Sequence, residues 1–103
     1  MNEQATRYPK LPSKIMGAGG MIKIVRQAEL TYEGKACWGL WDESTRTITI
    51  DSGATPEHAR RVFYHEVAHA MLADSGIENL FDDNTVEMLC DMIATGRMRE
   101  RFG

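Results

Sequence analysis

Two kinds of hydrophobic periodicity divide the chain. Between residues 21 and 51, apolar side chains alternate with polar ones, which is typical of strands that bury one face. From residue 56 to about residue 98, apolar side chains recur every three or four positions, as they do in amphipathic helices. Strands followed by helices predict an α+β fold.

The N-terminal part of the chain differs in composition from the remainder. Prolines and glycines are frequent in residues 1–20 and predict a flexible lead-in without regular structure. We expect residues 21–103 to form a single domain, because 103 residues are enough for one core only. The first strand is predicted over residues 21–25, where Ile22 and Ile24 share one face.

A hairpin is predicted to follow this strand. Residues 37–41 are rich in aromatic and apolar side chains, and residues 46–51 alternate strictly, so that Ile48 and Ile50 share the buried face. The polar residues 42–45 suit the connection between them. Together with the first strand, the hairpin predicts a small, mainly antiparallel three-stranded sheet.

Two helices are predicted after the sheet. Thr55 suits the N-cap of the first helix and Pro56 its first position, and Gly76 is the expected stop. The second helix is predicted to begin near Asn84 and to end in the basic run Arg97, Arg99 and Arg101. Its apolar arc consists of Val86, Leu89, Cys90, Ile93, Ala94 and Met98.

The first helix carries two histidines and a glutamate on its apolar face. His65 and His69 are four residues apart, which places their Cβ atoms roughly 6 Å apart and lets both imidazoles bind one ion. Glu66 suits a general base that acts on a metal-bound water. All three lie on the face opposite Arg60 and Tyr64, and burying them without a partner is costly. A metal ion is such a partner; a chance pair of hydrogen-bonded histidines is the alternative.

A catalytic zinc site needs three protein ligands, and the first helix supplies two. Glu87 on the second helix is the predicted third ligand, and Asp91 can then accept a hydrogen bond from the outer ring nitrogen of a ligand histidine. Cys90 and Asp91 are alternative third ligands. If Asn84 is the N-cap, Glu87 can instead complete a capping box.

This combination of residues resembles a known group of enzymes. His65, Glu66 and His69, followed on the next helix by Glu87 and Asp91, resemble the gluzincin pattern of zinc metallopeptidases. The preceding strands are similar to those of the ImmA/IrrE-like group and its small phage and prophage relatives. The resemblance implies a minimal zincin-like domain that binds one zinc ion through His65, His69 and Glu87. It also implies that Glu66 is the general base and that Asp91 supports a histidine.

The implied reaction is hydrolysis of a peptide bond in a peptide or protein substrate. Residues 47–51 are the predicted edge strand along which the substrate backbone would pair. Tyr32, Tyr64 and His58 are the candidates for stabilising the oxyanion. Two other functions are compatible with the sequence: a binding or regulatory module that zinc stabilises without turnover, and a metal-free interaction protein with a coincidental motif.

The composition of the chain limits the kinds of binding partner that we expect. A net charge of -3 gives no reason to expect nucleic acid. No apolar run approaches the roughly 20 residues that span a membrane, and the polar start lacks a signal-peptide hydrophobic region, so we expect a cytoplasmic protein. In that compartment Cys37 and Cys90 are expected to stay reduced. The sequence predicts no oligomeric state.

Overall fold

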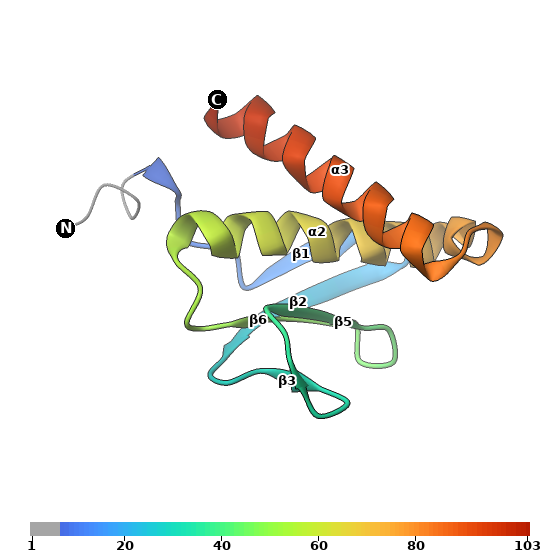
Figure 1. The fold of residues 1–103 in the computed structure, drawn as a ribbon, viewed down its shortest axis with the longest axis horizontal. Helices are drawn as coiled ribbons and strands as arrows, with labels where there is room; N and C mark the ends of the chain where they lie inside the picture. Colours follow the sequence, from blue (N-terminus) through green and yellow to red (C-terminus); the bar gives the residue numbers. More distant parts are fainter. Residues whose placement is uncertain (1–6) are drawn as a thin grey trace.

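The computed structural model describes residues 7–103, and its order of strands and helices confirms the predicted α+β class (Figure 1). The strands are β1 (Lys14–Gly17), β2 (Gly20–Gln27), β3 (Thr31–Tyr32), β4 (Lys35–Ala36), β5 (Gly39–Asp42) and β6 (Thr47–Asp51). The helices are α2 (Pro56–Ser75), the short 3₁₀ helix η1 (Ile77–Leu80) and α3 (Asp83–Phe102). Within residues 7–103, no helix combines the length and the apolar character that crossing a membrane requires.

The sheet differs from the predicted one. It has four strands in the order β1-β2-β6-β5, and β3 and β4 form a separate two-stranded hairpin. The outer pairs are antiparallel, but β2 and β6 run parallel, with Ile24 opposite Ile48. The prediction of three mainly antiparallel strands is therefore wrong in strand number and in the central pairing. Alternation specifies the face that a strand buries, whereas neighbour and direction depend on the long crossover between β2 and β6.

The additional strand, β1, lies in the stretch for which the sequence predicted no regular structure. It pairs with β2 through a tight turn, with Met16 opposite Met21 and Gly17 opposite Gly20. Gly20 has a φ of 130°, which side-chain-bearing residues rarely adopt. The glycines here thus form a hairpin turn and do not end regular structure. Residues 1–6 of the predicted lead-in lie outside the described residues.

The position of β6 contradicts its predicted role as an edge strand. Its two neighbours in the sheet, β2 and β5, occupy both of its hydrogen-bonding edges. A substrate backbone therefore has no free edge of β6 to pair with. The edge strand on this side of the sheet is β5.

Helix α2 lies across the sheet, and α3 crosses α2 on the side away from the sheet (Figure 1). The core between sheet and α2 includes the fully buried Ile22, Ile48 and Ile50. Arg60 and Tyr64, which the helical wheel placed on the polar side of α2, are also buried. The wheel was wrong there because Ala94 and Met98 of α3 join the same core cluster as Tyr64, so α2 is covered on more than one face.

The residues that begin and end each helix determine which helical turn carries the candidate site residues. The Thr55 hydroxyl accepts a hydrogen bond from the His58 amide at 3.2 Å, and Gly76 ends α2 in the left-handed region, as predicted. Helix α3, however, has Asp82 as its N-cap, with its carboxylate accepting from the Thr85 amide at 2.7 Å. The capping-box interpretation of Glu87 required Asn84 as the N-cap, and it is therefore wrong.

Candidate metal centre

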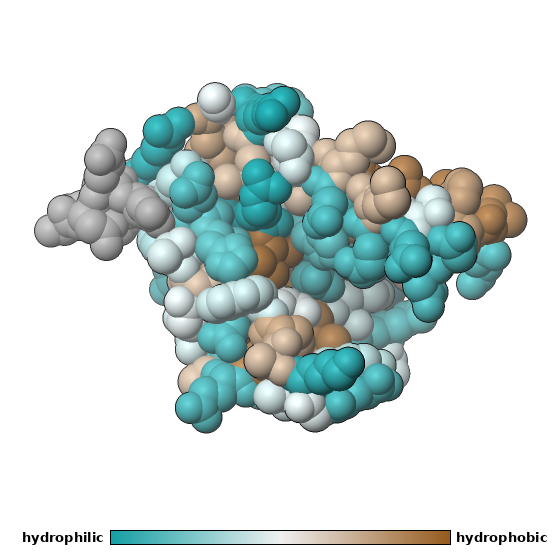
Figure 2. Space-filling model, viewed as in Figure 1, coloured by the Kyte–Doolittle hydropathy of each residue, from teal (hydrophilic) through white to brown (hydrophobic). Residues whose placement is uncertain are grey.

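His65 and His69 of α2 face a groove between the helices and the edge strand β5. A cavity of about 340 Å³ occupies it. Its lining residues are Tyr32, Gly39, Leu40, Trp41, His65, Glu66, His69 and Glu87. In the space-filling view, this face of the molecule is hollowed between the helices above and the β3 region below (Figure 2). The packing of α2 across the sheet thus brings strand and helix residues to one cavity.

Three of these residues bring their ligand atoms together. The Nε2 atoms of His65 and His69 are 3.2 Å apart, and the Glu87 carboxylate lies 3.1 Å from the first and 2.7 Å from the second. Ligand bonds of about 2.0–2.1 Å to a tetrahedral zinc ion would separate neighbouring ligand atoms by about 3.3 Å. The two imidazoles and the carboxylate therefore have the chemistry and the spacing of a group that could hold a metal ion.

Asp91 contacts the same histidine from its other side. Its carboxylate lies 2.8 Å from Nδ1 of His65, while Nε2 of that ring faces Glu87. A carboxylate accepts the Nδ1 hydrogen and leaves the Nε2 lone pair available to a metal. Asp91 thus occupies the supporting position that the sequence suggested, and its carboxylate is not part of the converging ligand group.

Cys90, the other alternative ligand, is not part of this group. It is fully buried between α2 and α3, against Ala68 and Val86. Burial, together with the negative charge of Glu87, raises the pKa of its thiol to about 12, so the thiolate that a metal needs is disfavoured. Cys90 and Cys37 are both free thiols. The structure therefore brings Glu87, and not Cys90, to the histidines.

Glu66 lies beside the ligand group in a nearly closed environment. Only 9% of its surface is exposed, and this burial raises the pKa of its carboxyl to about 7. The charge of His65 lowers the pKa and the charge of Glu87 raises it, but burial is the largest cause. A carboxyl group with this pKa can both accept and return a proton near neutral pH.

Gly39 of β5 contributes a wall of the site that sequence reasoning missed. A Cβ atom placed on Gly39 would lie 2.4 Å from Cγ1 of Val62 and 3.0 Å from Cγ of Glu66. The β5 backbone can therefore approach Glu66 this closely only because residue 39 has no side chain. A glycine inside a strand pattern is the signal that could have indicated such an approach.

The three candidates for oxyanion stabilisation lie in different places. Tyr32 lines the cavity beside the metal ligands. His58 instead packs against Trp38, with ring centroids 4.5 Å apart, and lines no part of that cavity. Tyr64 lines another cavity, together with residues of β1 and α3. Of the three, the structure brings only Tyr32 to the candidate site.

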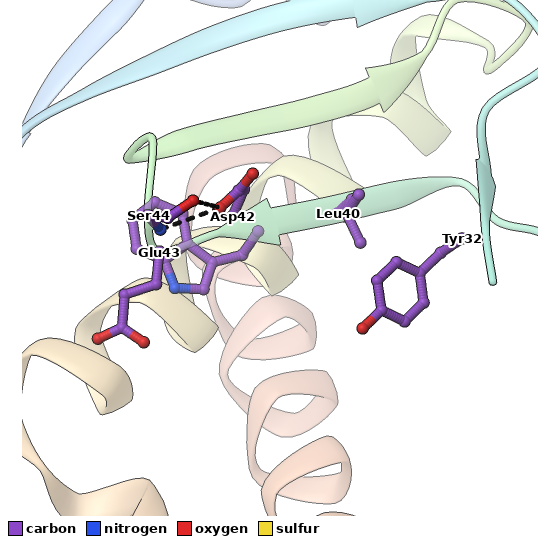
Figure 3. Close-up of a pocket in the computed structure, with 6 residues that line it drawn as sticks. Tyr32, Leu40, Asp42, Glu43 and Ser44 are labelled. Carbon is purple, nitrogen blue, oxygen red and sulfur yellow. Dashed lines mark hydrogen bonds between the residues drawn. The ribbon is translucent and has the colours of Figure 1, made fainter.

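A second hollow continues the site along β5. It has a volume of about 550 Å³ and shares Tyr32, Leu40 and Trp41 with the first cavity. Asp42, Glu43 and Ser44 line its far end. Figure 3 shows Tyr32 and Leu40 near one end of β5 and Glu43 at the other. Together the two cavities form a groove along β5, the edge strand on this side of the sheet.

Comparison with known proteins adds no relative to this description. No protein family, curated protein or solved structure matches the chain. The residues and their geometry therefore carry the functional argument. They establish that His65, His69 and Glu87 could together hold a metal ion.

Proposed function

We propose that this protein is a zinc-dependent metallopeptidase of the gluzincin type. The observation that carries the proposal is the position of the buried Glu66 beside the three converging ligand atoms of His65, His69 and Glu87. Two imidazoles, one carboxylate and an open position are the ligand set of a catalytic zinc site. Bound zinc would supply an activated water and polarise the scissile carbonyl group.

The chain's own residues provide the proton transfers and the ligand orientation. Glu66 accepts the proton of the attacking water and later delivers it to the leaving amine. Asp91 holds the His65 ring with Nε2 toward Glu87. The Tyr32 side chain is the candidate donor to the oxyanion.

The groove along β5 suits an extended peptide. Strand β5 pairs with β6 on one side only, so the backbone groups of its other edge are available to a substrate strand. Such a strand would cross the cavity that contains Glu66, because Gly39 and Leu40 of β5 line that cavity. This proposal replaces β6 with β5 as the strand that positions the substrate.

The decisive experiment is to compare wild type with Glu66→Gln. The variant keeps the shape of the side chain but cannot accept the proton. We expect it to bind zinc at the wild-type stoichiometry and to lose peptide hydrolysis by about 10²–10⁴-fold. Elemental mass spectrometry measures zinc, and cleavage of an unfolded protein such as casein measures turnover. Equal turnover by both proteins would remove Glu66 as the base.

A non-catalytic zinc-stabilised module remains the second candidate, for one specific reason. His65 and His69 come from α2 and Glu87 comes from α3, so a shared ion would link the two helices. Such a link stabilises a small domain whether or not turnover occurs. Three results on the wild-type protein would favour this candidate: binding of one zinc ion, loss of thermal stability on chelation, and no cleavage of any substrate.

A further inference from the structure

A separate cavity lies where α2 and α3 meet the β1–β2 hairpin. Its volume is about 390 Å³, within the roughly 300–1,000 Å³ that is common for ligand pockets. Tyr64 and Met71 are among the α2 residues that line this cavity, whereas His65 and His69 line the candidate metal-site cavity. Much of the wall is apolar, with contributions from Ile15, Phe63, Val67 and Met71.

The charged groups of this cavity all have the same sign. Arg60, Arg97 and Arg101 line it, and no aspartate or glutamate among the described residues does. This is unexpected in a chain whose net charge is -3. Within residues 7–103, the side chains of Arg97 and Arg101 form no ion pair or hydrogen bond. In this part of the chain, two guanidinium groups at the cavity therefore lack an anionic partner.

Its buried polar groups also lack partners. The Tyr64 hydroxyl and Nε of Arg60 are buried, and neither has a hydrogen-bond partner among the described residues. Both residues are more than nine-tenths buried. A buried polar group without a partner is destabilising. All four unpaired groups, from Arg60, Tyr64, Arg97 and Arg101, are hydrogen-bond donors, so an acceptor would satisfy them.

The Arg97 guanidinium stacks on the Tyr64 ring, a contact that does not neutralise its charge. Its guanidinium carbon lies 4.8 Å from the centroid of the Tyr64 ring. Stacking of this kind holds the guanidinium against the ring and leaves its N–H donors directed outward. A pre-ordered guanidinium loses little entropy when it pairs with a carboxylate. The stacking contact therefore favours recognition of an anion.

We propose that this cavity binds an apolar carboxylate. The carboxylate would pair with Arg97 and Arg101, and its apolar part would contact Ile15, Phe63 and Met71. Guanidinium groups bind carboxylates with two parallel hydrogen bonds, which fixes the orientation of the ligand. Fatty acids and the C-terminal residue of a peptide share this chemistry. The proposal does not depend on peptidase activity.

Methyl NMR of the zinc-loaded protein tests the proposal, with octanoate as the probe. We expect saturable shifts of the Ile15 and Met71 methyl signals, while those of Leu40, at the metal site, stay unchanged. Octanol and octylammonium, which have the same chain length, should bind at least 10-fold more weakly. Equal binding of all three compounds, or shifts confined to Leu40, would overturn the proposal.

Matched variants locate the anion site. Arg97→Gln should weaken octanoate binding about 10-fold or more, because it removes a charge-assisted hydrogen bond to the carboxylate. Arg99→Gln removes the same charge from an exposed position of α3 that does not line the cavity, and should have no such effect. Arg101→Gln serves as the second test if Arg97→Gln disturbs the methyl spectrum. Equal losses in the Arg99 and Arg97 variants would contradict the assignment.

A final comparison distinguishes the two sources of the carboxylate. Acetyl-Leu-Leu with a free carboxylate is titrated beside octanoate, and its C-terminal amide is the control. Tighter binding of the free dipeptide than of octanoate would indicate a peptide chain end. Tighter binding of octanoate would indicate a fatty acid. Binding of the amide as tight as that of the free dipeptide would contradict recognition of the carboxylate.

Discussion

The two ring nitrogens of His65 have different partners. Nε2 faces Glu87, and Nδ1 lies 2.8 Å from the Asp91 carboxylate. A carboxylate at the outer nitrogen fixes the tautomer and raises the basicity of the ligand nitrogen. The contributions of Glu87 and Asp91 to metal binding should therefore differ in kind.

We expect Asp91→Ala to weaken zinc binding by about 10–100-fold, and Glu87→Ala to remove most of the bound zinc. The reason is that Asp91 acts through His65, whereas Glu87 contributes a ligand atom. Competition with a chromophoric chelator measures both affinities. Glu100→Ala, an exposed acid near the other end of α3, is the control. If Asp91→Ala lost more zinc than Glu87→Ala, the two roles would have to be exchanged.

Gly39 provides a prediction about the general base, which rests on the proposed peptidase function. Gly39→Ala introduces a Cβ atom that meets both Val62 and Glu66. We expect zinc content to stay unchanged and hydrolysis to fall, because Glu66 must move. Overpacking of this kind costs about 1–3 kcal/mol of stability.

The double variant Gly39→Ala/Val62→Ala separates these effects. It removes the 2.4 Å contact with Val62 but keeps the 3.0 Å contact with Glu66. Unfolding in urea should show recovered stability, while hydrolysis stays low. Recovery of hydrolysis together with stability would show that Gly39 acts through packing alone.

At the scale of single residues, the spacing of side chains along each helix made part of the site predictable. His65 and His69 are one helical turn apart, and Asp91 is one turn after Glu87, so each pair lies on one face of its helix wherever the helix packs. Gly39 and Tyr32 come from strands far away in the sequence. Their place in the site depends on how the sheet and the β3–β4 hairpin are positioned relative to α2, which no local pattern encodes.

Among the elements, α3 begins near the predicted residue, but its N-cap is Asp82 and not Asn84. Asp82 caps it through the Thr85 amide, and this hydrogen bond lowers the pKa of the Asp82 carboxyl. The capping residue determines how the helix enters its first turn, and Glu87 follows in the second. Asn84, the residue that the sequence favoured, lies inside that first turn.

Two substitutions distinguish these N-caps. Asp82→Ala should lower the free energy of unfolding by about 1 kcal/mol, the usual cost of removing an N-cap side chain. Asn84→Ala should leave it nearly unchanged, because alanine is a good helix former at a position that does not cap. Urea unfolding monitored by circular dichroism measures both. A larger loss in the Asn84 variant would contradict the assignment of Asp82.

Helix ends and buried strand faces could be predicted from the sequence, because each depends on residues that are close together in the chain. The ends of α2 could be predicted because Thr55, Pro56 and Gly76 each favour one position for a local reason. Alternation correctly predicted β6 and its buried isoleucines. It could not predict that β6 lies between β2 and β5, because strand order depends on contacts between distant segments.

For the whole molecule, one ion pair connects the sheet to the end of α2. Arg46 forms two hydrogen bonds with Asp74, at 2.8 and 2.9 Å, and a third with the Gly20 carbonyl. Asp74 also accepts a hydrogen bond from the Gly19 amide at 2.9 Å. The contact therefore joins the β1–β2 turn, the residue before β6 and the last turn of α2.

This contact predicts a pH dependence of stability. The Arg46 guanidinium, aided by the Gly19 amide, lowers the pKa of the Asp74 carboxyl from 3.8 to about 2. Because the folded-state pKa is the lower one, the stabilisation is fully present above pH 3.8 and disappears as the pH falls toward 2. We expect Asp74→Asn to have a lower Tm than wild type at pH 6, and the difference to shrink over this range.

Thermal unfolding at a series of pH values between 6 and about 2 measures this difference. Asp83→Asn, on the exposed first turn of α3, is the matched control and should show little change at any pH. A Tm difference that stayed constant down to pH 2 would show that Asp74 contributes through shape and not through its charge.

The arrangement of the metal ligands on two consecutive helices has a consequence for the order of folding. Few residues separate α2 from α3, so bringing His65 and Glu87 together closes a short loop and costs little chain entropy. The parallel pairing of β2 with β6 joins segments separated by the β3–β4 hairpin and β5, and it forms more slowly. Under the proposed function, the helical pair would bind metal before the sheet is complete. Metal supply during synthesis would then affect the yield of folded protein.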